Sequence, residues 1–127
     1  MELIAIVTAL ALLQTFVFAF QVGQARVKHG VNAPATSGND DFDRAYRIHQ
    51  NTIEQIVIFI PSLWIFGYYV DERIGAGVGL VFIIARFIYR NAYRSNPKSR
   101  GTGFSMGALS MTILMVGGLI GAVMSLL

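Results

Sequence analysis

Four long apolar segments alternate with shorter polar connections along the chain. They cover residues 3–23, 44–70, 74–94 and 103–126, and each has the roughly 20 residues that a helix needs to cross a bilayer. The connection over residues 25–43 is rich in glycine, proline and asparagine, which is typical of a loop between helices. The pattern therefore predicts an all-α membrane protein in which residues 1–127 form one domain, a bundle of four transmembrane helices.

The last segment carries two pairs of glycines four residues apart, Gly103 with Gly107 and Gly117 with Gly121. Small residues at this spacing share one side of a helix and let a neighbouring backbone approach closely. We therefore expect these glycines to serve helix packing rather than chemistry.

The composition supports a membrane location and excludes several kinds of chemistry. Hydrophobic residues make up 54% of the chain and charged residues only 13%, about half the usual share for a soluble domain. The mean hydropathy is positive, at +0.57. The absence of cysteine excludes disulfides, thiolate metal sites and a cysteine nucleophile.

The basic residues are placed in a way that argues against nucleic-acid binding, although the net charge is +3. Eight of the ten border the first and third connections: Arg26, Lys28, Arg44, Arg47, Arg90, Arg94, Lys98 and Arg100. Connections rich in lysine and arginine face the cytoplasm. We therefore expect these two connections on the cytoplasmic side, with both termini on the opposite side.

A polar stripe marks the start of the second segment. Arg44, Arg47, Asn51 and Glu54 are three, four and three residues apart, so their side chains project from one face of a helix. Such a stripe is costly against lipid and should face protein, water or a charged ligand. A guanidinium, an amide and a carboxylate suit a zwitterionic, peptide-like ligand. A structural ion pair between Glu54 and Arg47 is the alternative.

The third segment carries a second polar face close to the same cytoplasmic end. Arg86, Tyr89, Arg90 and Tyr93 recur at intervals of three and four residues. Tyrosine and arginine are also common at membrane interfaces, where they reach the lipid headgroups. The convergence of both polar faces at one side of the membrane favours a ligand site.

Metal chemistry is not expected from this sequence. His29 and His49 are the only histidines, and no second pair of ligands with metal-binding spacing accompanies them. No spacing supports a Ser-His-Asp arrangement or a binding site for a hydride-carrying cofactor.

These residues together resemble the MAPEG family, the membrane-associated proteins of eicosanoid and glutathione metabolism. The resemblance spans nearly the whole chain. The residues that carry it are Ala25-Arg26, the Arg-x-x-x-Asn-x-x-Glu pattern of Arg47, Asn51 and Glu54, Ala85-Arg86 followed by Tyr89 and Tyr93, and finally Arg100.

The resemblance implies a homotrimer of four-helix subunits with glutathione as co-substrate, bound between adjacent subunits and open to the cytoplasm. It implies conjugation of glutathione to a lipophilic substrate from the bilayer, or reduction of that substrate. The glutathione contacts would be Arg47, Asn51, Glu54, Tyr89 and Tyr93, with Arg26 and His49 reaching in from the neighbouring subunit. Arg100 would stabilise the thiolate, for which Lys98 or Arg94 is the alternative cation.

Two positions depart from relatives that make leukotriene C4. Val27 stands where those relatives have a second arginine, and Gln55 stands where they have a tyrosine. An eicosanoid product is therefore not implied. Two other functions stay open at this point, a non-catalytic member of the family that binds lipid or a partner protein, and a small proton-coupled multidrug exporter that uses Glu54.

Overall fold

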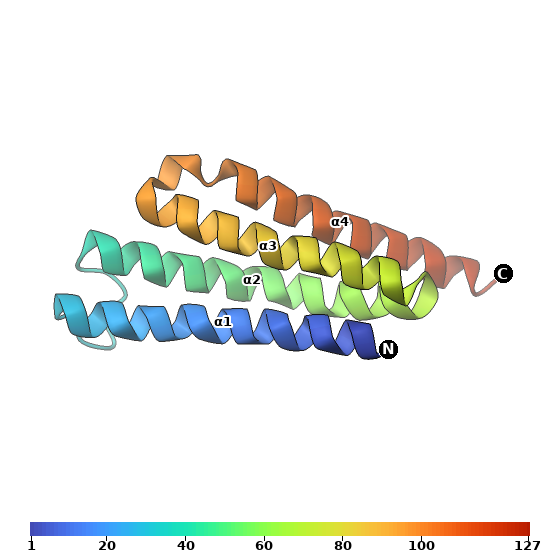
Figure 1. Cartoon of the computed structure of the whole chain (residues 1–127), viewed down its shortest axis with the longest axis horizontal. Coiled ribbons are helices and arrows are strands. Elements are labelled where there is room, and N and C mark those ends of the chain that lie inside the picture. Colours follow the sequence, from blue (N-terminus) through green and yellow to red (C-terminus); the bar gives the residue numbers. More distant parts are fainter.

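The computed structural model describes residues 1–127 as four long helices with one short 3₁₀ turn and no strand. The helices lie side by side, and both termini are at the same end of the bundle (Figure 1). Their bounds are α1 Glu2–His29, α2 Asp40–Tyr69, α3 Glu72–Ser95, η1 Pro97–Ser99 and α4 Gly101–Met124. The predicted all-α fold class is confirmed.

Local capping explains why α2 begins before the apolar segment that the sequence marks. The Asn39 side chain accepts hydrogen bonds from the backbone N–H groups of Asp41 and Phe42, at 2.9 and 3.1 Å. Three aspartates in the first turn lie where the helix dipole favours negative charge. At the opposite end, Asp71 caps α3 by accepting a hydrogen bond of 2.8 Å from the Ile74 N–H. The two middle helices are therefore joined by a very short link.

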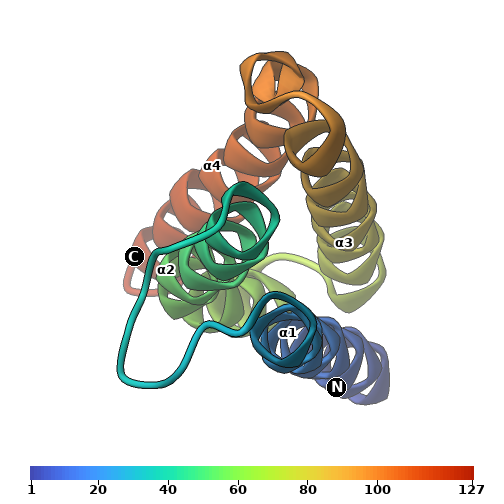
Figure 2. The same cartoon turned by 90° about the vertical axis from the view of Figure 1, so that its left-hand side faces the viewer.

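Three parts of the chain are long and apolar enough to cross a membrane: α1, α2 and residues 97–124, which include α4. The remaining helix, α3, carries Arg86, Arg90 and Arg94 in its second half. Its 24 residues correspond to about 36 Å of helix, so it extends alongside its neighbours. Both α2 and α3 pack against α1 and against α4, and Figure 2 shows α1 and α4 separated by α2.

The apolar core lies toward the end of the bundle that holds the termini. Its largest cluster takes residues from all four helices, among them Ile4, Phe59, Phe82 and Leu114, all fully buried. The rings of Phe59 and Phe82 are stacked with their centres 3.9 Å apart. A smaller cluster of Phe18, Ile48 and Tyr89 lies farther along, without a contribution from α4. Tight apolar packing of all four helices is thus confined to one part of the bundle.

Close backbone contacts of α4 confirm the expected role of the glycines at three of the four positions. A Cβ atom on Gly103 would lie 2.4 Å from the Tyr89 backbone nitrogen and 2.9 Å from the Ala85 carbonyl oxygen. Gly117 and Gly121 are comparably close to Phe66 and Val70 of the α2 end, whereas Gly107 makes only ordinary contacts. The start of α4 is therefore held against the backbone of α3.

We predict that Gly103→Ala destabilises the fold by about 2 kcal/mol or more, because the added methyl meets rigid backbone rather than a movable side chain. Gly77→Ala is the matched control, since a Cβ at Gly77 has no neighbour within 4 Å. That variant should be neutral, or more stable by up to about 1 kcal/mol. Thermal unfolding of the detergent-solubilised proteins measures both, and equal midpoints would contradict the close contact.

Candidate functional site

A polar pocket of about 820 Å³ lies between α2, the end of α3 and the start of α4. Five of the eight predicted site residues line it, Arg47, Asn51, Tyr89, Tyr93 and Arg100, as does the alternative cation Lys98. Gly101 and Phe104 complete the lining. The fold thus brings together side chains from distant parts of the sequence. The two farthest apart, Arg47 and Phe104, are separated by 57 positions.

The polar stripe of α2 divides among different environments. Arg47 and Asn51, one helical turn apart, face the pocket. Arg44 instead donates a hydrogen bond of 2.9 Å to the backbone carbonyl of Arg94. Glu54 is exposed on the outer surface and lines no described pocket. No ion pair joins Glu54 to Arg47, so the structural alternative from the sequence is not formed within this chain.

Two tyrosines of α3 form the aromatic wall of the pocket. Tyr89 is 3% exposed, and its ring stacks on that of Tyr93 with 5.6 Å between the centres. Gly103 holds α4 against the backbone at Tyr89. Because Arg100 lies one turn before Gly103, the same contact brings Arg100 to the pocket.

Hydrogen bonds within the turn before α4 hold Lys98 and Arg100 beside the pocket. Asn96 accepts a hydrogen bond of 3.1 Å from the Lys98 backbone N–H, and Arg100 donates one of 2.8 Å to the Pro97 carbonyl. Both side chains are exposed toward the pocket side of this turn. Either cation is therefore available to a bound ligand.

The lining favours an anionic ligand that also carries hydrogen-bond donors. Arg47, Lys98 and Arg100 are cationic, and no carboxylate lines the pocket. The Asn51 side-chain oxygen is buried and accepts no hydrogen bond within the chain. Buried acceptors are normally paired, so this oxygen is suited to a donor on a ligand. No group of three or more His, Asp or Glu side chains could hold a metal ion.

Three predicted site residues lie outside the pocket in the single chain. Arg26 donates a hydrogen bond of 2.7 Å to the Ala35 carbonyl, and its guanidinium lies 4.8 Å from the centre of the Phe42 ring. His49 is half-buried on α2 and, like Glu54, does not reach the pocket. Within one copy of the chain, these residues do not meet the other five.

The residues of the polar face of α3 also lie in different environments, which their helical spacing did not predict. Arg86 is fully buried and donates a hydrogen bond of 2.8 Å to the Thr52 hydroxyl. Arg90 turns toward α1, where its Nε donates to Gln21 at 3.1 Å. Gly101 and Phe104 were not singled out in the sequence, although Phe104 follows Arg100 by four residues and so shares its side of a helix.

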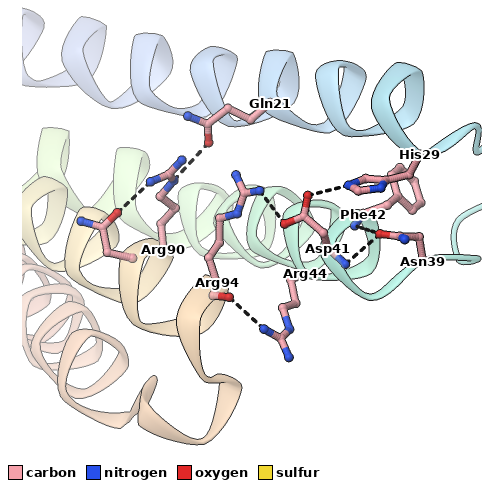
Figure 3. Close-up of polar contacts among 9 residues, drawn as sticks. Gln21, His29, Asn39, Asp41, Phe42, Arg44, Arg90 and Arg94 are labelled. Atoms are coloured by element: carbon pink, nitrogen blue, oxygen red, sulfur yellow. Dashed lines mark hydrogen bonds and ion pairs between the residues drawn. The ribbon is translucent and has the colours of Figure 1, made fainter.

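An ion-pair network joins three helices beside the pocket (Figure 3). Asp41 of α2 accepts hydrogen bonds from Arg94 of α3 at 2.7 Å and from His29 of α1 at 2.9 Å. The hydrogen bond from Arg94, and to a smaller extent that from His29, holds the pKa of the Asp41 carboxyl below its ordinary value of 3.8. Arg94 is thus engaged with Asp41 and does not line the pocket. Of the three cations considered for the thiolate, only Arg100 and Lys98 line it.

Long apolar helices with a cation-lined polar pocket at one end of the bundle define an integral membrane protein with a candidate site for an anionic ligand. The family model described as the MAPEG family matches residues 4–120. The chain therefore belongs to the MAPEG family.

Several relatives match most of this chain and most of their own length. An uncharacterised protein of Synechocystis sp. is 44% identical over 91% of this chain and 85% of its own. Microsomal glutathione S-transferase 2 of Homo sapiens is 40% identical over 89% of this chain and 78% of its own. Leukotriene C4 synthase of Cavia porcellus is 34% identical over 89% of this chain and 75% of its own. The chain is therefore related to membrane glutathione transferases.

We predict that Asp41→Asn destabilises the bundle by about 1 kcal/mol at neutral pH, a modest value because the carboxylate is partly exposed and screened by solvent. A lowered pKa in the folded state means that the stabilisation is complete above the ordinary value of 3.8 and is lost as the pH falls below it. The difference between wild type and Asp41→Asn should therefore shrink in acid.

Asp40→Asn is the control, because Asp40 occupies the same first turn of α2 and makes no ion pair. Thermal unfolding in detergent, followed across a range of pH values, measures the difference. A constant difference between wild type and Asp41→Asn at all pH values would contradict the role of the ion pair.

Proposed function

We propose that this protein is a membrane-bound glutathione transferase that conjugates glutathione to lipophilic electrophiles or uses it to reduce lipophilic peroxides. The observation that carries this proposal is the pocket lined by three cations, one unpaired amide oxygen and two tyrosines, with no carboxylate. The names of two relatives, microsomal glutathione S-transferase 2 and leukotriene C4 synthase, support the same class of enzyme.

Glutathione carries two carboxylates, one ammonium group and a thiol, so it is a net anion at neutral pH. The planar guanidinium of Arg47 suits one carboxylate, because it presents two parallel donors. The Asn51 oxygen accepts from an N–H of the peptide, and the hydroxyls of Tyr89 and Tyr93 supply further hydrogen bonds. The pocket thereby orients the tripeptide with its thiol toward the start of α4.

Arg100 stabilises the glutathione thiolate, and Lys98 is the second cation within the same lining. A fixed positive charge favours loss of the thiol proton to water, and the thiolate is the nucleophile. In conjugation, sulfur forms a bond to the electrophilic carbon while the leaving group departs with its electron pair. In peroxide reduction, the thiolate attacks the terminal peroxide oxygen, the O–O bond breaks, and the other oxygen leaves as an alcohol after protonation. The glutathione sulfenic acid that forms then reacts with a second glutathione to give the disulfide and water.

The exposed position of Glu54 supports a homotrimer in which the glutathione site is completed by a neighbouring copy. A carboxylate is costly against lipid, so a second copy is the better environment for this face of α2. Arg26 and His49, which lie outside the pocket in one copy, then contribute from the neighbour. The pocket opens to the cytoplasm, because it lies at the end of the bundle where the basic connections gather.

No observation favours the exporter that the sequence left open, because Glu54 lines no cavity of the single chain.

The lipophilic substrate reaches the thiolate from the bilayer side. Phe104 is the apolar group of the lining nearest in sequence to Arg100 and offers a contact for this substrate.

We predict that the solubilised protein binds glutathione and conjugates it to an aryl halide, and that Arg100→Ala lowers kcat on the order of a hundred-fold. Lys98→Ala tests the alternative cation in the same assay. Arg73→Ala is the matched control, since Arg73 is an exposed arginine at the opposite end of the bundle.

Each outcome of this assay decides a separate point. Wild-type protein that is folded yet binds no glutathione at millimolar concentration would overturn the proposal. Binding without any turnover would instead favour a non-catalytic member of the family. Unchanged kcat in Arg100→Ala, with a large loss in Lys98→Ala, would transfer the thiolate role to Lys98.

We also predict that Asn51→Leu weakens glutathione binding about ten-fold, because a ligand donor loses its buried acceptor. Isothermal titration calorimetry measures the dissociation constant. Asn91→Leu is the control, because Asn91 is exposed and its side-chain oxygen accepts a hydrogen bond from Arg90, outside the pocket. Equal affinities of the two variants would exclude Asn51 from the binding site.

A further inference from the structure

Arg86 is a buried charge without a counter-charge. Its side chain is 0% exposed, and one nitrogen, Nη2, donates to the Thr52 hydroxyl at 2.8 Å. The other two, Nε and Nη1, have no hydrogen-bond partner, and no ion pair includes this residue. Burying a guanidinium in this state is costly. A function is therefore expected to accompany it.

The contacts of Arg86 lead directly to the pocket. Its guanidinium carbon lies 4.2 Å from the centre of the Tyr89 ring, and Tyr89 in turn stacks on Tyr93. Thr52, its hydrogen-bond partner, is the sequence neighbour of Asn51. Arg86 itself does not line the pocket. It stands behind the aromatic wall and restrains one of the two tyrosines.

The surroundings do not neutralise this charge. From α2, the pocket receives Arg47, while His49 and Glu54 lie outside it. From α3 and the following turn, the titratable groups at the pocket are Tyr89, Tyr93, Lys98 and Arg100. Neither α1 nor α4 contributes any: α4 contains no titratable side chain, and α1 places the amide of Gln14 against the Ile83 carbonyl at 2.9 Å. Positive charge therefore predominates on both sides of the aromatic wall.

We propose that Arg86 is a positioning residue that holds the Tyr89 ring in place and supplies a fixed positive charge behind the pocket, which favours the thiolate of bound glutathione. This inference rests on the proposed function. Arg86 transfers no proton and touches no substrate. The thiol proton passes to water, and the sulfur remains as the anion. Because Arg86 is buried, its fixed charge is screened less than a charge in solvent.

Arg86→Met is the decisive variant, because an apolar side chain of similar length replaces a buried charge with little loss of stability, or even a gain. Arg86→Lys retains a charge but loses the planar contact with the ring. Arg90→Met is the matched control, since it removes a charge from the same helix, one turn later, at a side chain that faces α1. The readouts are the pH dependence of kcat/KM and the ultraviolet absorbance of the bound thiolate.

In Arg86→Met, we expect the pH at which bound glutathione ionises to rise by about one unit, with kcat/KM at neutral pH falling on the order of ten-fold. Arg86→Lys should keep the wild-type ionisation while turnover falls, and Arg90→Met should match wild type in both. The inference is overturned if bound glutathione ionises at the wild-type pH in folded Arg86→Met. It is also overturned if Arg86→Lys raises that pH as much as Arg86→Met does.

If Arg86→Met does not fold, Arg86→Gln replaces it, because the amide can still donate to Thr52 without a charge. The same shift is expected, and its absence has the same meaning. A wild-type protein that binds no glutathione would overturn the proposed function itself. A wild-type enzyme with normal turnover, together with an unmoved ionisation in the variant, would overturn only the role of Arg86.

Discussion

The backbone contact between α3 and α4 at Gly103 determines the geometry on which the pocket depends. Only a residue without a Cβ allows α4 to lie this close to the Tyr89 backbone. Arg100 lies one turn before Gly103, at the end of the short 3₁₀ turn. The contact therefore places Arg100 in the same pocket as Arg47 and Asn51 of α2. A small residue in the helix interface thus places a charged residue in the site.

The bundle divides its length between two kinds of packing. Toward the termini, all four helices meet around stacked aromatic rings in a mainly apolar core. Toward the basic connections, α1, α2 and α3 are joined by the ion pairs of Asp41. The space beside them is lined by cations and tyrosines. The apolar core and the polar pocket therefore occupy separate ends of the same helices, which lets a polar pocket exist within an apolar protein.

Membership in the MAPEG family and the chemistry of the pocket point to the same class of reaction. The family match identifies the fold and its relatives, whereas the cationic lining of the pocket suits an anionic ligand in physical terms. Positive charge in front of the aromatic wall, from Arg100 and Lys98, and behind it, from Arg86, acts on one sulfur atom in our proposal.

The sequence by itself determined the helices and the polar faces of α2 and α3, because long apolar segments, turn residues and residue spacing are local properties. The family was indicated by the resemblance of the motif residues to the MAPEG family. The sequence did not determine which members of a polar face would meet. Arg86 and Arg90 share a face by spacing, yet one is buried against Thr52 and the other turns to Gln21. The rotation of each helix about its axis decides this, and that rotation is set by contacts between distant segments, such as the approach of Gly103 to Tyr89.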